Sequence, residues 1–279
     1  MKKREPKRFV TQRDLEVLKF LWRWKALSTA ALAKKFFPGI RPFTAYERLL
    51  KLEKARYIKS YPFRHRQGCV WMLGKRGYRF VFPYLLEMKE PGYGSENPVH
   101  DFYSTAFHLG EWLTAKPDQG YTCSELELHR LEKDLLPSWA ITSPERRPDG
   151  YSLIRRDGGT QLYSFEAELT MKSRARYDKI LSFYDEQDTI AGVFWLVASP
   201  QIQKAIQTQA ATASRPRIHH FLQLDDFRKL GWLAPLRGGL LDGKTMVQVL
   251  LDGSSTAAQL KFDGSDTQAL LQNAKRPII

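Results

Sequence analysis

The chain has 279 residues, of which 43% are hydrophobic, and a formal net charge of +14. This length and composition suit a globular protein with two domains or one large one. No apolar run is long enough to span a membrane, and no apolar stretch follows the basic N-terminus, so we expect no signal peptide and a cytoplasmic protein. Cys69 and Cys123 are too few for a disulfide framework or a cysteine-based zinc site.

The positive charge is concentrated in the first third of the chain. Of the 44 basic and 30 acidic residues, 23 and 7 lie within residues 1–90, which leaves 21 and 23 for the remainder. A DNA-binding module joined to a separate domain has this distribution, whereas a surface that is basic only for solubility spreads its charge. We therefore expect nucleic acid, rather than a membrane or an acidic protein, as the partner.

The first ninety residues predict three helices and a hairpin. Thr11 is a good N-cap with Asp14 three positions later, and the apolar residues after it share one helical face. A second helix opens at Ser28 and ends before Pro38-Gly39, and a third follows Thr44 as far as residue 58. Two short strands, 58–63 and 69–73, flank a basic turn at 64–68, and a further helix starts at Gly74.

Three helices followed by a basic hairpin resemble the winged helix-turn-helix superfamily of DNA-binding domains. The resemblance covers about eighty residues and implies that the third helix enters the major groove of double-stranded DNA while the hairpin contacts phosphates or the minor groove. A solvated helix face or an exposed turn remains the alternative for each single residue. The residues that could face DNA are Arg41, Thr44, Tyr46, Arg48 and Lys51 near the third helix, and Arg64, His65 and Arg66 in the hairpin turn.

Residues 91–98 are rich in Pro and Gly and read as a linker, and a helix is predicted over 99–115. His100, Ser104, His108 and Glu111 fall on one stripe of that helix. The stripe could bring His100 towards a metal site. Alternatively, one of the two histidines is buried with its hydrogen bonds made inside the protein, and the other is exposed. The spacing does not fit a zinc helix. Residues 123–129 alternate in polarity, which predicts a strand whose acidic face is solvated.

Three carboxylates are predicted to meet where two strands pair. Asp149 lies at the turn before a strand at 151–156, and a tight turn at 157–159 leads to a strand at 161–169. Glu166 and Glu168 alternate with apolar residues and so point to the same side. Clustered carboxylates repel one another unless a cation holds them, and oxygen ligands suit Mg²⁺ or Mn²⁺. Surface ion pairs with Arg155, Arg174 or Arg176 are the alternative.

These residues resemble the PD-(D/E)xK nuclease superfamily, with Pro148-Asp149 as "PD" and Glu166-Ala167-Glu168 as "(D/E)xK". Over residues 10–225 the chain looks like the plasmid replication-relaxation family, which includes MobC-type mobilisation relaxases. The resemblance implies that Asp149, Glu166 and Glu168 bind the metal, with His100 as an accessory residue. Glu168 stands where most relatives have Lys, and Lys179 on the next helix could replace that lysine. Tyr177 or Tyr184 could attack DNA covalently, although packing roles are the simpler interpretation.

The rest of the chain alternates strands and helices. Strands are predicted at 191–199 and 218–224 with a helix between them, followed by a short helix at 225–231, a hairpin at 238–256 and a polar tail. We therefore predict an α/β (α+β) fold, with a winged helix-turn-helix at 1–90, a linker at 91–98, a restriction-endonuclease-like mixed sheet flanked by helices at 99–253, and a tail at 254–279.

Two hypotheses about function follow. In the first, the chain is a metal-dependent DNA-nicking endonuclease or relaxase of plasmid mobilisation or replication. In the second, it is a non-catalytic DNA-binding regulator of transcription or replication. Its nuclease-like domain is then degenerate and mediates dimerisation or contact with a partner, so a homodimer is possible. No phosphate-binding "GxxxxGK[ST]" motif occurs, which argues against an ATP-driven motor.

Overall fold

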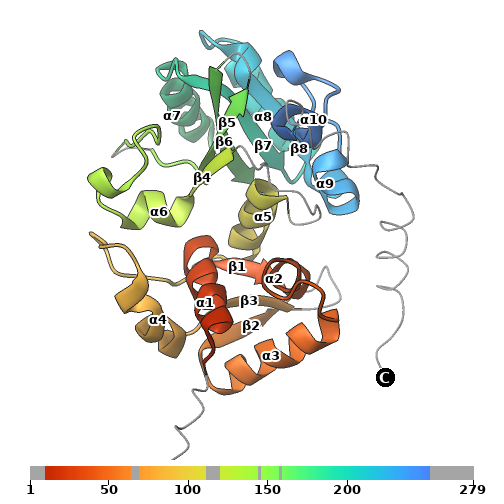
Figure 1. Cartoon of the computed structure of the whole chain (residues 1–279). Coiled ribbons are helices and arrows are strands. Elements are labelled where there is room, and N and C mark those ends of the chain that lie inside the picture. Colours follow the sequence, from red (N-terminus) through yellow and green to blue (C-terminus); the bar gives the residue numbers. More distant parts are fainter. Residues whose placement is uncertain (1–9, 64–68, 111–119, 144–145, 157–158, 252–279) are drawn as a thin grey trace, which may run out of the picture.

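The computed structural model describes residues 10–63, 69–110, 120–143, 146–156 and 159–251. Two units are visible in Figure 1: an N-terminal unit of residues 10–84 in red and orange, and a C-terminal unit of residues 98–251 in yellow to blue. Helix α5, in olive, lies between them. None of the helices in these ranges is long and apolar enough to cross a membrane.

The N-terminal unit packs helices around a small antiparallel sheet whose strand order is β1-β3-β2. All of its predicted helices and both hairpin strands are present. Its elements are α1 (Gln12–Trp24), β1 (Ala26–Ser28), α2 (Thr29–Phe36), α3 (Pro42–Lys54), β2 (Ile58–Pro62), β3 (Cys69–Leu73), α4 (Lys75–Val81) and a 3₁₀ turn, η1 (Phe82–Tyr84).

Helix α3 differs from its predicted bounds at both ends. It begins at Pro42, two residues before Thr44, because proline at the first helical position has the required φ and lacks an amide hydrogen that would be unpaired there. It ends at Lys54, and Arg56 then adopts a positive φ of 64°, which turns the chain into β2.

The C-terminal unit contains a five-stranded mixed sheet in the order β4-β5-β6-β7-β8. Strands β4, β5 and β6 pair antiparallel, and β6, β7 and β8 pair parallel, so the predicted mixed α/β architecture is confirmed. The main elements are α5 (Pro98–Leu109), β4 (Gly120–Ser124), α6 (Glu125–Arg130), β5 (Gly150–Arg156), β6 (Gly159–Glu168), α7 (Arg174–Asp185), β7 (Ile190–Val197), α8 (Pro200–Ala210), β8 (His219–Gln223), α9 (Leu224–Leu230) and α10 (Met246–Leu251). Short 3₁₀ turns are η2 (Lys133–Leu135), η3 (Pro216–Ile218), η4 (Gly231–Leu233) and η5 (Gly239–Leu241).

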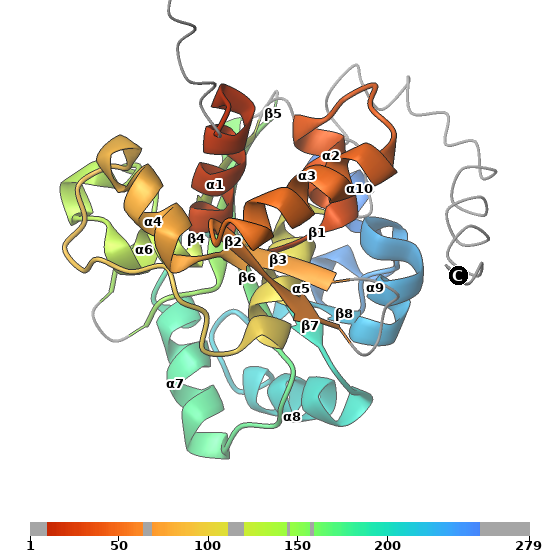
Figure 2. The same ribbon diagram turned by 90° about the horizontal axis from the view of Figure 1, so that it is seen from below.

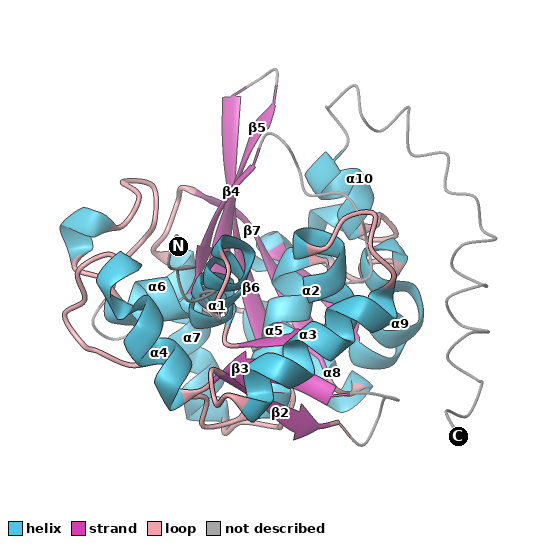
Figure 3. Cartoon of the chain, turned by 60° about the horizontal axis from the view of Figure 1, so that its bottom comes forward, coloured by secondary structure: helices cyan, strands magenta, loops and turns pink. Residues whose placement is uncertain are grey.

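Helices cover both faces of this sheet, as the view in Figure 3 shows for the strands in magenta. On one face, Phe107 of α5 packs against Phe165 of β6, with 5.3 Å between the ring centroids. On the other, Tyr184 of α7 packs against Trp195 of β7 at 6.2 Å, and α7 and α8 lie side by side in Figure 2. Odd-numbered residues of β6 therefore face α5, and even-numbered ones face α7.

Two predicted elements are wrong. Residues 125–130 form helix α6, because the Ser124 hydroxyl and the Glu127 carboxylate close a capping box at its start. The alternation over so few residues did not distinguish a strand from a short helix. The hairpin predicted at 238–256 is instead η5 and α10 as far as residue 251.

The end of α1 is inserted into the C-terminal unit, and we call this contact the seam. Lys25 adopts a positive φ of 57°, and its ammonium lies 2.9 Å from Glu125 Oε2 and 3.3 Å from Asp101 Oδ1. The Trp24 carbonyl accepts a hydrogen bond of 2.6 Å from the Thr105 hydroxyl. Arg23 pairs with Glu127 at 2.8 Å. The seam is therefore charged and largely buried, unlike a loose contact between tethered domains.

Candidate functional site

Asp149 is fixed beside the end of β6. Its amide donates to the Phe165 carbonyl at 3.1 Å, and its Oδ2 accepts from the Ala167 amide at 2.7 Å. The side chain thus binds a backbone amide of β6 two residues beyond Phe165, which pairs with the first residue of β5. Asp149 therefore lies next to the part of β6 that carries Glu166 and Glu168, as the strand pairing predicted.

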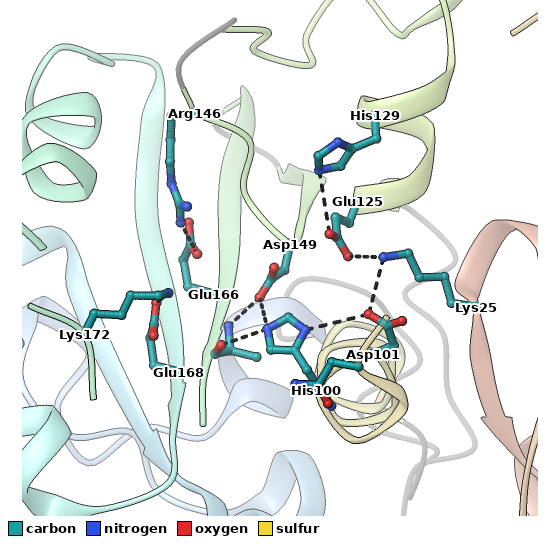
Figure 4. A network of polar contacts seen from close by, with 12 residues as sticks. Lys25, His100, Asp101, Glu125, His129, Arg146, Asp149, Glu166, Glu168 and Lys172 are labelled. Carbon is teal, nitrogen blue, oxygen red and sulfur yellow. Dashed lines mark hydrogen bonds and ion pairs between the residues drawn. The ribbon is translucent and has the colours of Figure 1, made fainter. Parts of the chain in front are cut away.

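Glu166 and Glu168 are buried on the α7 side, with exposed fractions of 2% and 1%. The Glu166 carboxylate accepts hydrogen bonds from the Arg146 guanidinium and the Tyr184 hydroxyl, and Glu168 is paired with the Lys172 ammonium. These contacts appear in Figure 4, apart from Tyr184. The surface pairs with Arg155, Arg174 or Arg176 do not form. Arg155 instead lies over the Tyr121 ring, and Arg174 and Arg176 are exposed.

The charges of this cluster are set by burial and by its ion pairs. Burial opposes charging of Arg146, but Glu166, Tyr184 and Asp149 together outweigh burial and raise the pKa of Arg146. Burial raises the pKa of the Glu168 carboxyl, although Lys172 acts in the opposite direction. Burial and the Glu166 charge raise the pKa of the Tyr184 phenol well above its usual value, so this hydroxyl stays protonated and donates to Glu166.

His100, in the first turn of α5, approaches Asp149 from the other side of β6. Its Nε2 lies 3.1 Å from the Ala167 carbonyl oxygen and 3.5 Å from Asp149 Oδ2. The Asn97 side chain caps α5 by accepting from the His100 amide at 3.2 Å. Figure 4 shows that the chain of polar contacts continues through Asp101 to Lys25 of the seam. The N-terminal unit therefore supplies one charge to the surroundings of Asp149.

The His100–Asp149 pair predicts a measurable titration. Burial opposes charging of His100, but the Asp149 carboxylate beside it raises the histidine pKa from 6.5 to about 9. Folded protein should therefore retain a proton on His100 that unfolded protein releases, so the stability contributed by His100 is present below pH 6.5 and is lost as the pH rises through about 9. Burial raises the pKa of Asp149 to about 7, so the two groups form an ion pair between about 7 and 9. Nitrogen chemical shifts of His100, assigned with His100→Gln, should titrate near 9, and Asp149→Asn should lower that value. A titration near 6.5 in both proteins would contradict the pairing.

The lysine beside the carboxylates is not the predicted one. Lys179 is exposed on α7, whereas Lys172, in the loop between β6 and α7, pairs with Glu168. The sequence carried a signal for it, because Lys172 is the first lysine after the strand. Tyr177 and Tyr184 are both buried, as packing roles require, yet Tyr184 also contacts Glu166.

The remaining histidine of the α5 stripe is a core residue. His108 is buried, its Nε2 lies 3.0 Å from the Tyr151 carbonyl oxygen, and its ring stacks on Phe165 at 4.3 Å. The last member of the stripe, Glu111, lies outside the described residues.

Four of the candidate DNA-binding residues are exposed around α3: Arg41, Thr44, Tyr46 and Lys51. Arg48 turns inward instead. Its guanidinium donates to both oxygens of the fully buried Asp14, at 3.0 Å from Nε to Oδ1 and 2.5 Å from Nη2 to Oδ2. Arg64, His65 and Arg66 lie outside the described residues.

The donor chemistry at Asp149, Glu166 and Glu168 fits a hard cation such as Mg²⁺ or Mn²⁺, because all three supply carboxylate oxygens. In the structure these carboxylates contact basic side chains of the protein instead: Glu166 contacts Arg146, Glu168 contacts Lys172, and Asp149 contacts His100. Among the residues that the structure describes, no three His, Cys, Asp or Glu side chains are grouped so as to hold a metal ion. Metal binding at these carboxylates would require Arg146 and Lys172 to move away.

Three comparisons bear on the identity of the chain. No protein-family model matches it, and neither a curated protein nor a solved structure does.

Proposed function

We propose that the chain binds double-stranded DNA through its N-terminal unit and nicks it at the Asp149 site in a reaction that depends on Mg²⁺ or Mn²⁺. The observation that carries the proposal is the hydrogen bond from the Ala167 amide to Asp149, which places this carboxylate beside a strand with two more. Such an arrangement of acids from two strands is what a PD-(D/E)xK nuclease requires.

The N-terminal unit supports the DNA-binding part of the proposal. The order of its helices and strands, and the pairing of β1 with β3, are compatible with a winged helix and support that proposal. Helix α3 would be the recognition helix, and it exposes Arg41, Thr44 and Lys51. Residues 1–90 contain 23 basic and 7 acidic residues, and this positive excess favours a polyanionic partner.

The side chains around Asp149 would divide the work of phosphodiester cleavage. Asp149, Glu166 and Glu168 would hold the metal ion, which activates water and stabilises charge on the phosphate. Lys172, released from Glu168 when the metal ion binds, would orient the attacking water or neutralise the phosphate, a role that Glu168 cannot fill. Protonated His100, 3.5 Å from Asp149 Oδ2, would hold this carboxylate in place and add a positive charge beside it.

Nicking of supercoiled plasmid in the presence of Mn²⁺ tests the proposal. We expect the wild type to convert supercoiled to open-circular DNA, and Asp149→Asn and Glu166→Gln each to reduce the rate by at least 100-fold, on the order of the loss when one group that stabilises developing charge is removed. Asp178→Asn, on the exposed side of α7, is the matched carboxylate control and should keep full activity. An intact plasmid with the wild type, together with retained duplex binding, would reject the nuclease.

One observation favours the second candidate, a non-catalytic DNA-binding regulator. Glu166 and Glu168 are buried and already neutralised by Arg146 and Lys172, so the cluster is stable without a metal ion. In this case the C-terminal unit would serve contacts rather than chemistry. Duplex binding without Mn²⁺ binding at the carboxylates would support this candidate over the nuclease.

A further inference from the structure

Helix α3 exposes a stripe of large side chains, which we call the outer stripe. Phe43 is 68% exposed, Leu50 39% and Tyr46 36%. Phe43 and Leu50 are seven residues apart, and Tyr46 lies between them, so all three project from one side of the helix. Glu47 and Lys54 are exposed on the same side. The opposite side, with Ala45, Leu49 and Leu52, is buried and fixes this orientation.

The outer stripe is held rigidly by the residues behind it. The Tyr46 ring contacts the buried Trp71 ring at 6.0 Å, and Trp71 donates its indole hydrogen to the Thr29 hydroxyl at 2.8 Å. The ion pair between Arg48 and Asp14 joins α3 to α1. The apolar side chains of the stripe are thus presented by a fixed helix, which favours a role in binding over a poorly packed surface.

The charges around the outer stripe indicate what covers it. The basic residues beside the apolar side chains are Arg41, Lys51 and Lys54. They belong to residues 1–90, which carry a large excess of positive charge. A second copy of the chain would bring the same positive charge to the contact and would be repelled. A partner that combines negative charge with exposed apolar groups fits better. The DNA major groove has both, because phosphates line its edges and thymine C5 methyl groups project from its floor.

We propose that Phe43, supported by Tyr46 and Leu50, reads the C5 methyl groups of pyrimidines in the major groove. This inference rests on the proposed DNA binding and adds to it a preference for methyl-bearing sequences. Phe43 lies in the first turn of α3, and the N-terminal residues of a recognition helix are those that contact base edges. The basic residues beside it position the helix on phosphates but carry no sequence information.

Matched duplexes that differ only in the methyl group test the inference. The full chain should bind alternating d(A-T) duplex about fourfold more tightly per buried methyl group than alternating d(A-U) duplex, from the transfer free energy of one such group. Alternating d(G-C) duplex containing 5-methylcytosine should likewise bind more tightly than its unmethylated form. Fluorescence anisotropy at one salt concentration measures all four affinities.

Phe43→Ala should abolish both differences, while Phe82→Ala, at an exposed phenylalanine on η1, should leave them unchanged. Equal affinity of the wild type for methylated and unmethylated duplexes would overturn methyl readout but leave DNA binding standing. So would an equal loss of affinity for all duplexes in Phe43→Ala. Absence of any duplex binding would overturn the proposed function itself. If sedimentation shows a dimer that Phe43→Ala dissociates, the outer stripe is a self-association surface and the inference fails.

Discussion

Replacing Arg146 by glutamine should lower the free energy of unfolding by about 3 to 5 kcal/mol in the presence of a chelator. The substitution leaves the Glu166 carboxylate buried without its cation, and removing one partner of a buried ion pair costs about this much. The Tyr184 hydroxyl would remain as a donor to Glu166 but carries no compensating charge. Urea unfolding of the two proteins gives the difference.

Mn²⁺ should then restore stability to Arg146→Gln but change the wild type little. Without Arg146, a divalent cation is the natural neutralising group for Glu166 and Asp149, and a ligand at 100 times its dissociation constant stabilises by about 2.7 kcal/mol. Arg155→Gln, at an exposed arginine on β5, is the matched control and should respond to chelator and metal as the wild type does. If Mn²⁺ stabilises none of the three proteins, the carboxylates do not bind metal. That result would support the non-catalytic regulator over the nuclease.

Replacing Asp14 by alanine should destabilise the N-terminal unit by a similar amount, about 3 to 5 kcal/mol. This buried carboxylate has two functions, since it accepts from the Thr11 amide at 2.7 Å as part of a capping box and holds the Arg48 guanidinium. Both the cap of α1 and the link to α3 are lost together. Glu16→Ala, whose carboxylate makes surface contacts with Lys19 and Gln12, should change stability by no more than about 0.5 kcal/mol.

Acid provides a second measurement for Asp14. Burial acts to raise its pKa, but the hydrogen bonds from Arg48 and Thr11 outweigh burial and lower it below 3.8. The stability contributed by a carboxylate with a lowered pKa is present above its unfolded value and is lost as the pH falls through the folded one. Wild type should therefore lose this increment below pH 3.8, and Asp14→Ala should not. An identical acid dependence in both would contradict the assigned ion pair.

The same pair changes what a test of DNA binding at Arg48 would mean. Arg48→Met should reduce duplex binding through loss of folded α3, so its effect should follow the stability loss. Lys51→Met, on the exposed side of the same helix, should leave stability unchanged and lower the salt dependence of binding by about one phosphate contact.

Features set by neighbouring residues could be predicted from the sequence. Thr11 with Asp14 marked the start of α1, and the alternation around Glu166 and Glu168 fixed their common side of β6. Asp149 lies beside the end of β6 because β5 and β6 pair in the register that sets Gly150 opposite Phe165.

Features set by contacts between distant segments could not be predicted. The pairing of Arg146 with Glu166 depends on the path of the loop before β5, for which no local pattern exists. The positive charge of Arg48 predicts an exposed side chain. Burial of Leu49 and Leu52 on the same helix instead turns Arg48 towards Asp14. Lys25 could not be connected to Asp101, 76 residues away, without the fold.

The seam would give the protein a fixed register along DNA. Movement of the N-terminal unit relative to the Asp149 site would have to break the partly buried contacts of Lys25 with Asp101 and Glu125 and the buried hydrogen bond from Thr105 to Trp24. A helix held in the major groove would then present the scissile phosphate at a constant number of base pairs from the recognised bases, each step measuring about 3.4 Å along the duplex. Position, rather than the sequence at the cut itself, would decide where the backbone is opened.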